Sequence, residues 1–373
     1  MTSPGRWLRT TMHSPALEGN ALGDPADRPV EVYLPPGYDD DDRRYPAVYV
    51  IQGYLGRMAT WHNDQAYRST FPEQVDRLFT DGLAALRREV GPLDDGVDPG
   101  VPPPCVVVLV DAWTSLGGSQ YVDSPGTGRY ASYLCDDVVG FVDATVRTVA
   151  APGSRALTGK SSGGFGAMVA PMRRPDVFGA LATHAGDALY EHSYLPLFAR
   201  VARALRPYGG SIQAYLAELA GRPALTRPDD ADVVNVYGVS ACFSADPDGT
   251  PRLPFDPRTG RLDERRWQRW LDLDPVRMVA GHADALRGLR GIWVDAGLRD
   301  EYFLDLGAQA FLAELAAVGV DGGPGGPALH AAAYEAGHAN INHRYPQSLA
   351  WLASVLDPAT PAAPAPAVGA GDR

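Results

Sequence analysis

Two short runs of consecutive apolar residues constrain the fold of this chain more than any other feature. Ala47–Gln52 (AVYVIQ) and Cys105–Asp111 (CVVVLVD) have the length of a strand but lack the polar alternation of a strand with one solvated face. Such runs are typical of parallel strands that are buried on both faces. The sequence therefore predicts a mostly parallel central sheet with helices on both of its faces.

Further segments support this architecture. Strands are predicted around residues 7–11 and at Val30–Leu34, Ala156–Thr158, Ala180–Ala185, Gly291–Ala296 and Ala331–Tyr334. Helical periodicity covers Gln74–Val90, Leu134–Thr148, the segment after Ser161 and Pro346–Val355. Strands that alternate with helices over this length predict the α/β class.

One block interrupts the alternation. Between about residues 189 and 289 we expect helices at Leu195–Leu205, Ile212–Leu219, Glu264–Leu271 and Pro275–Leu286, but no strand. We interpret this block as a helical cap insertion, with Trp267 and Trp270 in its core. The predicted organisation is an N-terminal segment (1–28), a single domain (29–356) that contains the cap at about 189–289, and a disordered Pro/Ala-rich tail (357–373).

Charge and composition exclude several classes of function. The net charge of −12 argues against a partner that is a nucleic acid or an anionic membrane, because phosphate contacts need clustered positive charge. Cys105, Cys135 and Cys242 are too few and too scattered for a disulfide framework or a zinc site, and we expect neither metal nor cofactor. No stretch approaches the roughly 18 apolar residues of a membrane span, and no secretory leader is apparent, so a cytoplasmic protein is expected.

The glycine-rich segment Gly159-Lys160-Ser161-Ser162-Gly163 carries the clearest chemical signal. It is a G-x-S-x-G motif between a predicted strand and a predicted helix, as in a nucleophile elbow. The sharp turn needs small neighbours and presents the serine at a helix N-terminus, where the free N–H groups favour developing negative charge. Ser161 is thus the candidate nucleophile, and a plain glycine-rich loop is the alternative.

A serine nucleophile needs a base and an acid that orients the base. Asp300, in the loop after the predicted strand 291–296, is the first choice for the acid. Glu301 is the close competitor and Asp295 the third choice. The alternative role of Asp300 is to cap the helix that begins near Tyr302, because Asp is a favoured N-cap residue.

The candidate base is His338. It follows the last predicted strand, precedes the final helix and has a glycine beside it, which places it where the base of such a triad is expected. His343 is the alternative five residues further on, and His330 precedes the strand. For the oxyanion we expect backbone N–H donors from Ser162 and from Tyr54, with Leu55 as the second choice in that loop.

The motifs together resemble those of the esterase D family. The resemblance runs from about Val30 to Val355 and is carried by V-Y-L-P-P-G-Y (32–38), R-Y-P-A-V-Y-V-I-Q-G-Y (44–54), S-P-G-T-G-R-Y (124–130), G-K-S-S-G-G-F-G-A-M (159–168), R-R-P-D-V-F-G-A (173–180), G-L-R-D (297–300) and G-H (337–338). It implies an α/β-hydrolase fold with Ser161 as nucleophile, His338 as base, Asp300 as acid, and Tyr54 and Ser162 as backbone oxyanion donors. The chain departs from the family at Gln52, where many relatives have His or Asp, and in the long separation between Ser161 and Asp300.

These residues define the expected function. We predict a serine hydrolase that cleaves a small-molecule carboxylic ester or thioester through an acyl-enzyme on Ser161. The alternatives are an acyltransferase, which passes the acyl group to an alcohol or amine, and a scaffold without activity. The walls of the substrate pocket are expected among Gln52, Leu55, Trp113, Tyr121 and Asp187, with Glu191 as an alternative to Asp187. The oligomeric state is not predicted.

Overall fold

The computed structural model describes residues 2–223 and 225–358. Its centre is an eight-stranded sheet in the order β1-β2-β4-β3-β7-β8-β9-β10. The strands are β1 (Arg6–His13), β2 (Asp27–Leu34), β3 (Ala47–Ile51), β4 (Val106–Val110), β7 (Arg155–Lys160), β8 (Ala180–His184), β9 (Gly291–Gly297) and β10 (Ala328–Tyr334). β2 is antiparallel to both of its neighbours, and every other pairing is parallel. The predicted mostly parallel sheet is confirmed.

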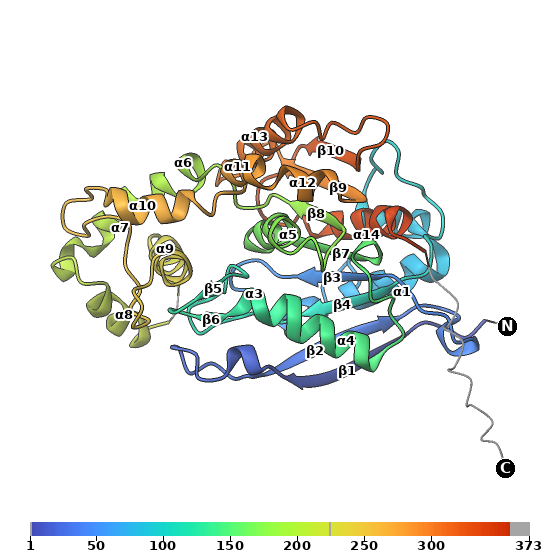
Figure 1. Cartoon of the computed structure of the whole chain (residues 1–373). Coiled ribbons are helices and arrows are strands. Elements are labelled where there is room, and N and C mark those ends of the chain that lie inside the picture. Colours follow the sequence, from blue (N-terminus) through green and yellow to red (C-terminus); the bar gives the residue numbers. More distant parts are fainter. Residues whose placement is uncertain (1, 224, 359–373) are drawn as a thin grey trace, which may run out of the picture.

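Helices cover both faces of the sheet, as Figure 1 shows. One face packs on α1 (Phe71–Asp81), α2 (Arg87–Val90) and α14 (Tyr345–Val355), and the other on α4 (Val139–Thr145), α5 (Ser162–Arg173) and α13 (Leu304–Ala317). Strand β9 illustrates the arrangement, since Ile292 and Val294 join one hydrophobic core and Trp293 the other. A strand that is buried on both faces has no polar side, which explains the continuous apolar runs in the sequence.

Three predicted helices differ from the observed ones. The predicted helix Pro275–Leu286 is divided into two short α-helices (Pro275–Met278 and Ala283–Arg287) by a 3₁₀ turn at Val279–His282. The segment 74–90 is interrupted at Gly82, whose φ of +88° ends α1, and a Cβ there would lie only 2.7 Å from the carbonyl carbon of Gly100. The chain continues as a short 3₁₀ helix (Leu83–Leu86) and α2. The segment 134–148 begins earlier, at Tyr130, contains a π-helical stretch (Tyr133–Val138) and ends at Thr145.

The N-terminal residues are part of the sheet. β1 pairs with β2 from Arg6 to His13, so the short strand expected around residues 7–11 is longer than predicted. The division of the chain at residue 29 stays a prediction. The predicted disordered tail falls on 357–373, of which 359–373 lie outside the described residues.

The block between residues 189 and 289 is helical. It contains α6 (Tyr190–Ser193), α7 (Leu195–Leu205), α8 (Ile212–Ala220), α9 (Asp230–Phe243), α10 (Glu264–Leu271), α11 (Pro275–Met278) and α12 (Ala283–Arg287). Figure 1 shows α7 to α10 grouped beside the hairpin of β5 (Asp123–Ser124) and β6 (Gly128–Arg129). Phe198 and Trp270 of this block belong to the same hydrophobic core as Phe165 of α5. We call residues 189–289 the insertion, and their description as a cap stays a prediction.

Helix α9 was not predicted from the sequence. Every residue from Val236 to Phe243 is buried, so this half of the helix has no polar face and no 3.6-residue periodicity. Its valine, tyrosine and phenylalanine residues also favour strands in isolation. Packing within the insertion, rather than local preference, selects the helix.

Asp274 links the first residues of the insertion to the start of α11. Its fully buried carboxylate accepts hydrogen bonds from the backbone N–H groups of Leu189 (3.0 Å), Tyr190 (2.9 Å) and Val276 (3.0 Å). Asp274→Ala leaves these donors without their acceptor and is expected to lower the free energy of unfolding by about 3 kcal/mol. Urea denaturation measures this loss, and the exposed neighbour substitution Asp272→Ala should cost less than about 0.5 kcal/mol.

Candidate active site

Ser161 lies at a sharp turn between β7 and α5. Its φ of +57° and ψ of −125° are rare for a residue with a side chain, and they raise the serine above the carboxyl end of the sheet. The turn requires glycine on both sides, because a Cβ on Gly159 would lie 2.4 Å from the backbone of Gly163, and a Cβ on Gly163 would lie 2.8 Å from the carbonyl oxygens of Ile51 and Gln52. The G-x-S-x-G motif thus forms the expected strand–turn–helix.

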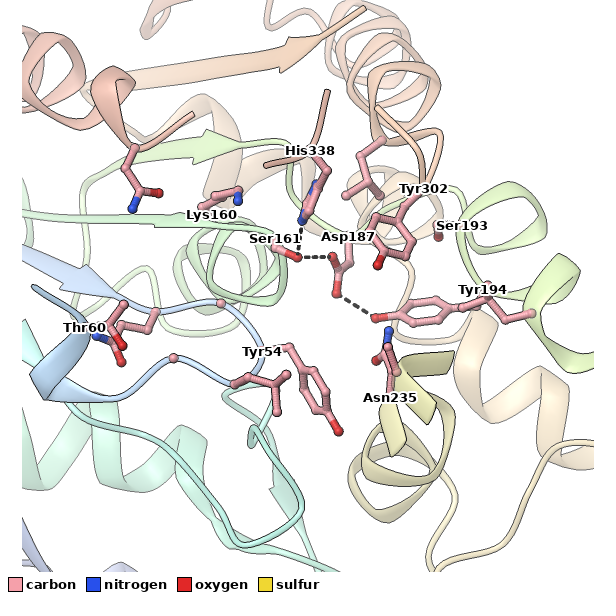
Figure 2. A pocket seen from close by; sticks show the side chains of 18 of the residues that line it. Tyr54, Thr60, Lys160, Ser161, Asp187, Ser193, Tyr194, Asn235, Tyr302 and His338 are labelled. Carbon is pink, nitrogen blue, oxygen red and sulfur yellow. Dashed lines mark hydrogen bonds between the residues drawn. The ribbon is translucent and has the colours of Figure 1, made fainter. Parts of the chain in front are cut away.

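A chain of hydrogen bonds links Ser161 to two residues that are distant in the sequence. The Nε2 atom of His338 lies 3.1 Å from Ser161 Oγ, and its Nδ1 lies 2.8 Å from Asp300 Oδ2. His338 follows β10, and Asp300 follows β9, so adjacent parallel strands bring the two loops together. Because a carboxylate only accepts hydrogen bonds, Nδ1 carries the proton and Nε2 is free to accept the serine hydroxyl. The structure brings all three predicted residues together, and Figure 2 shows His338 beside Ser161.

The three candidate acids occupy different positions. Asp300 contacts the imidazole, while Oε2 of Glu301 accepts the backbone N–H of His338 at 2.7 Å. This hydrogen bond lowers the pKa of the Glu301 carboxyl. Asp300 also accepts the backbone N–H of Tyr302 on its other oxygen at 2.9 Å, so it supports the start of the next segment as well as the histidine.

Asp295, the third choice, belongs to a separate buried network. Its carboxylate contacts His184 Nδ1 (2.9 Å), Trp293 Nε1 (2.7 Å) and Arg344 Nε (2.9 Å). Burial alone would raise the pKa of Asp295, but His184 and Arg344 together lower it. His184 Nε2 lies 2.9 Å from Ser348 Oγ, which makes a second Ser–His–Asp chain. All three of its side chains are enclosed, so no substrate can reach it.

The two alternative histidines lie elsewhere. His330 pairs with Asp94 at 3.0 Å and stacks on Trp293. His343 makes a local hydrogen bond to the carbonyl oxygen of Asn340. Neither lines the cavity next to Ser161.

The backbone N–H groups of Ser162 and Tyr54, beside Ser161, have no acceptor among the described residues. The N–H of Leu55, the second choice, instead donates to Gly117 O at 3.1 Å. Gly53 lets this loop approach the elbow, because a Cβ there would lie 3.0 Å from Lys160 O and 3.3 Å from Ser161 Cβ. The arrangement offers the two donors that an oxyanion hole needs.

The Tyr54 side chain fixes this loop to the insertion. Its buried hydroxyl lies 2.6 Å from Leu116 O and 2.8 Å from Val234 O, and Val234 belongs to α9. Burial raises the pKa of the Tyr54 phenol. The insertion therefore helps to set the position of one N–H donor next to Ser161, a role that no sequence motif indicated.

A cavity of about 340 Å³ opens at Ser161. Its walls come from the loop after β3, the elbow, the insertion and the loops after β9 and β10. They are formed by Gln52, Gly53, Tyr54, Leu55, Gly56, Thr60, Trp61, Lys160, Asp187, Ser193, Tyr194, Leu197, Ala231, Asn235, Tyr302, Leu304, His338, Asn342 and Tyr345. Three of the five predicted pocket residues, namely Gln52, Leu55 and Asp187, are among them.

The other two predicted pocket residues do not line this cavity. Tyr121 is buried behind the loop, where its hydroxyl donates to Gln52 O at 2.7 Å. The Trp113 ring lies under the guanidinium of Arg57, 3.6 Å from the ring centroid. These contacts hold the two side chains outside the wall of the cavity. Glu191, the alternative to Asp187, forms an ion pair with Arg277 near the surface.

Asp187 is the predicted pocket residue that touches the nucleophile. Its Oδ1 lies 3.4 Å from Ser161 Oγ, and its Oδ2 accepts the Tyr194 hydroxyl at 2.6 Å. Burial raises the pKa of the Asp187 carboxyl. Sequence reasoning did not single out Lys160, Tyr194, Asn235 or Tyr302 as cavity residues, and only Lys160 had a local signal, as a neighbour of Ser161 in the motif.

The strand order, the elbow and the linked Ser161, His338 and Asp300 define the class of protein as an α/β-hydrolase. Residues 20–319 match the model of the family described as "Putative esterase". This match covers well over half of the chain, and the chain belongs to that family. His338 lies beyond the matched residues.

A curated relative covers less of the chain. The uncharacterized protein YbbA of Bacillus subtilis (strain 168) is 27% identical over 164 residues, which are 43% of this chain and 58% of YbbA. The match thus spans less than two thirds of the length of that relative.

Solved structures share the fold over almost the whole chain. A ferulic acid esterase covers 95% of this chain and 100% of its own, with a TM-score of 0.53 at 15% identity. An S-formylglutathione hydrolase from Agrobacterium tumefaciens covers 96% and 99% (TM-score 0.51, 16% identity). The substrate-bound fluorophosphonate-binding serine hydrolase FphF of Staphylococcus aureus covers 94% and 99% (TM-score 0.54, 11% identity). The predicted α/β-hydrolase fold is confirmed.

Among residues 2–223 and 225–358, no helix has the length and apolar character that a membrane crossing requires. The same residues contain no group of three or more His, Cys, Asp or Glu side chains arranged to hold a metal ion.

Proposed function

We propose that this protein is a serine hydrolase that cleaves a carboxylic ester, or a thioester, of a small molecule. The observation that carries the proposal is the hydrogen-bonded chain from Ser161 Oγ through His338 to Asp300, which opens on a cavity of about 340 Å³. A cavity of this size accommodates a small organic molecule. Membership of the esterase family supports the same reaction class.

In the first half of the proposed reaction, Ser161 Oγ attacks the ester carbonyl carbon and its proton passes to His338 Nε2. The carbonyl oxygen becomes an oxyanion that accepts hydrogen bonds from the N–H groups of Tyr54 and Ser162. When the intermediate collapses, the bond between the carbonyl carbon and the alcohol oxygen breaks, and the alcohol takes the proton from His338. The acyl group remains on Ser161.

In the second half, water attacks the acyl-enzyme while His338 accepts its proton. The acid product leaves, and the proton returns to Ser161 Oγ. Asp300 holds Nδ1 protonated throughout and stabilises the imidazolium in both halves. Asp187 competes for the serine proton, but its oxygen is 0.3 Å more distant from Oγ than His338 Nε2 is, at 3.4 Å against 3.1 Å.

Two measurements test the proposal. A fluorophosphonate probe should label Ser161, which peptide mass mapping identifies. 4-Nitrophenyl esters of graded chain length should release 4-nitrophenol with a burst when deacylation is slow. Absence of both labelling and release would remove the hydrolase proposal.

The acceptor is tested separately, because a transferase uses the same acyl-enzyme. Alcohols or amines are added to the ester assay, and free acid is compared with transferred product. A hydrolase forms mainly free acid. Predominant transfer at millimolar acceptor would replace hydrolysis with acyl transfer as the function.

A further inference from the structure

Apart from tyrosines, three ionisable side chains line the cavity, namely Lys160, Asp187 and His338. His338 is paired with Asp300, and Asp187 accepts a hydrogen bond from the Tyr194 hydroxyl and lies 3.4 Å from Ser161 Oγ. Lys160 is the last residue of β7 and directly precedes Ser161, and its amine forms no hydrogen bond or ion pair with any described residue. Of the three side chains, Lys160 is therefore the one whose N–H donors have no acceptor within residues 2–223 and 225–358.

The surroundings of Lys160 set its charge. The pKa of its amine is lowered overall, because the effect of burial exceeds the opposing effect of the negative charges of Asp300 and Glu301. Neither carboxylate neutralises Lys160 by direct contact, because Asp300 binds the ring of His338 and Glu301 binds its backbone N–H. An ammonium group that is partly withdrawn from water without an anionic partner is costly, and a ligand that supplies an anion recovers that cost.

The side-chain type fits this role. Lys160 is the only lysine of the chain, and the other basic side chains are arginines and histidines. An ammonium group is a compact charge with three N–H donors on a flexible side chain. It can therefore bind a carboxylate without the planar alignment that a guanidinium group requires. Figure 2 shows Lys160 and Asp187 on opposite sides of Ser161. An anionic group is repelled on the Asp187 side and attracted on the Lys160 side, which gives the substrate one orientation across the nucleophile.

We propose that the cavity takes esters that carry a carboxylate group, and that Lys160 binds this carboxylate while the ester carbonyl lies at Ser161. The inference rests on the proposed hydrolase function and names its substrate class. The carboxylate could belong to the acyl part or to the alcohol part of the ester, and the test has one arm for each.

Each arm compares a carboxylate ester with the amide that replaces only its charge. For the alcohol part, the pair is 4-acetoxybenzoate and 4-acetoxybenzamide. For the acyl part, it is monomethyl glutarate and its terminal amide, methyl 4-carbamoylbutanoate. The wild-type protein should prefer the carboxylate in at least one arm by about 10- to 100-fold in kcat/KM, the worth of a charge-assisted hydrogen bond. The preference should shrink as the salt concentration rises, because the site is partly exposed.

Two variants assign the preference to the charge of Lys160. Lys160→Met keeps the length of the stem and removes the charge, so the ratio of carboxylate to amide turnover should fall close to one. Lys160→Arg keeps the charge and should retain most of the ratio. Equal turnover of carboxylate and amide by the wild-type protein in both arms would overturn the inference. An equal loss of turnover of the carboxylate ester and of its amide in Lys160→Met would also overturn the inference, because Lys160 would then only maintain the position of Ser161.

A separate measurement distinguishes this inference from the hydrolase proposal. Fluorophosphonate labelling of Ser161 and hydrolysis of neutral 4-nitrophenyl esters test the reaction without any carboxylate. If both succeed and the carboxylate pairs show no preference, the substrate class is wrong and the reaction class stands. If both fail, the hydrolase proposal fails and the inference fails with it.

Discussion

Replacement of Ser161 by alanine is expected to reduce the kcat of ester hydrolysis by about 10⁶-fold and to abolish fluorophosphonate labelling. Oγ is the atom that forms the bond to the acyl group, and neither His338 nor Asp300 replaces it. The cavity and the N–H groups of Tyr54 and Ser162 remain, so binding of the ester should change little. Initial rates at saturating ester and in-gel fluorescence of the labelled protein measure both effects.

Ser348 provides the matched control. Its Oγ lies 2.9 Å from His184 Nε2, and His184 pairs with Asp295, so its contacts copy those of Ser161 in a buried setting. Ser348→Ala should lower the free energy of unfolding by about 1 kcal/mol while labelling persists. Loss of labelling in folded Ser348→Ala, with retention in Ser161→Ala, would reverse the assignment of the nucleophile.

The fold was predictable where burial leaves a pattern in the sequence. Strands such as β3 and β4 are enclosed on both faces, and their apolar runs record that directly. Helix α9 is enclosed over much of its length too, but an enclosed helix has no periodicity to detect. The break in the segment 74–90 depends on how closely Gly82 approaches Gly100, a contact that the sequence does not record.

The residues of the candidate site likewise include some that the sequence predicts and others that depend on contacts within the fold. Ser161 was found because the elbow needs small residues at fixed positions, and His338 because its loop follows the last strand. The choice between Asp300 and Glu301 depends on which carboxylate faces the imidazole. Both residues are acidic and adjacent, so only the backbone conformation of the loop decides which side chain does so. Trp113 and Tyr121 lie outside the cavity wall because they contact Arg57 and Gln52, which are distant from them in the sequence.

The choice of acid can be decided by the second large effect. Asp300→Asn is expected to lower kcat by about 10⁴-fold with little change in the cavity. The amide of asparagine can donate to Nδ1 and favour the tautomer with its proton on Nε2, which cannot accept the serine proton. Loss of the carboxylate also removes the charge that stabilises the imidazolium. Steady-state rates with a neutral 4-nitrophenyl ester measure the loss, and slow labelling of Ser161 should persist.

Glu301→Gln is the matched substitution one residue away. Glutamine keeps an oxygen that can accept the backbone N–H of His338, the contact that Glu301 makes at 2.7 Å. We therefore expect less than about a tenfold loss of kcat, because neutral acceptors hold an N–H less strongly than carboxylates do but leave the loop in place. If Glu301→Gln costs about 10⁴-fold and Asp300→Asn does not, Glu301 is the acid, and the 2.8 Å contact of Asp300 with the imidazole does not persist during turnover. Each variant replaces one carboxylate by an amide. The comparison therefore separates the carboxylate that orients the imidazole ring of His338 from the one that holds the loop of His338 in place.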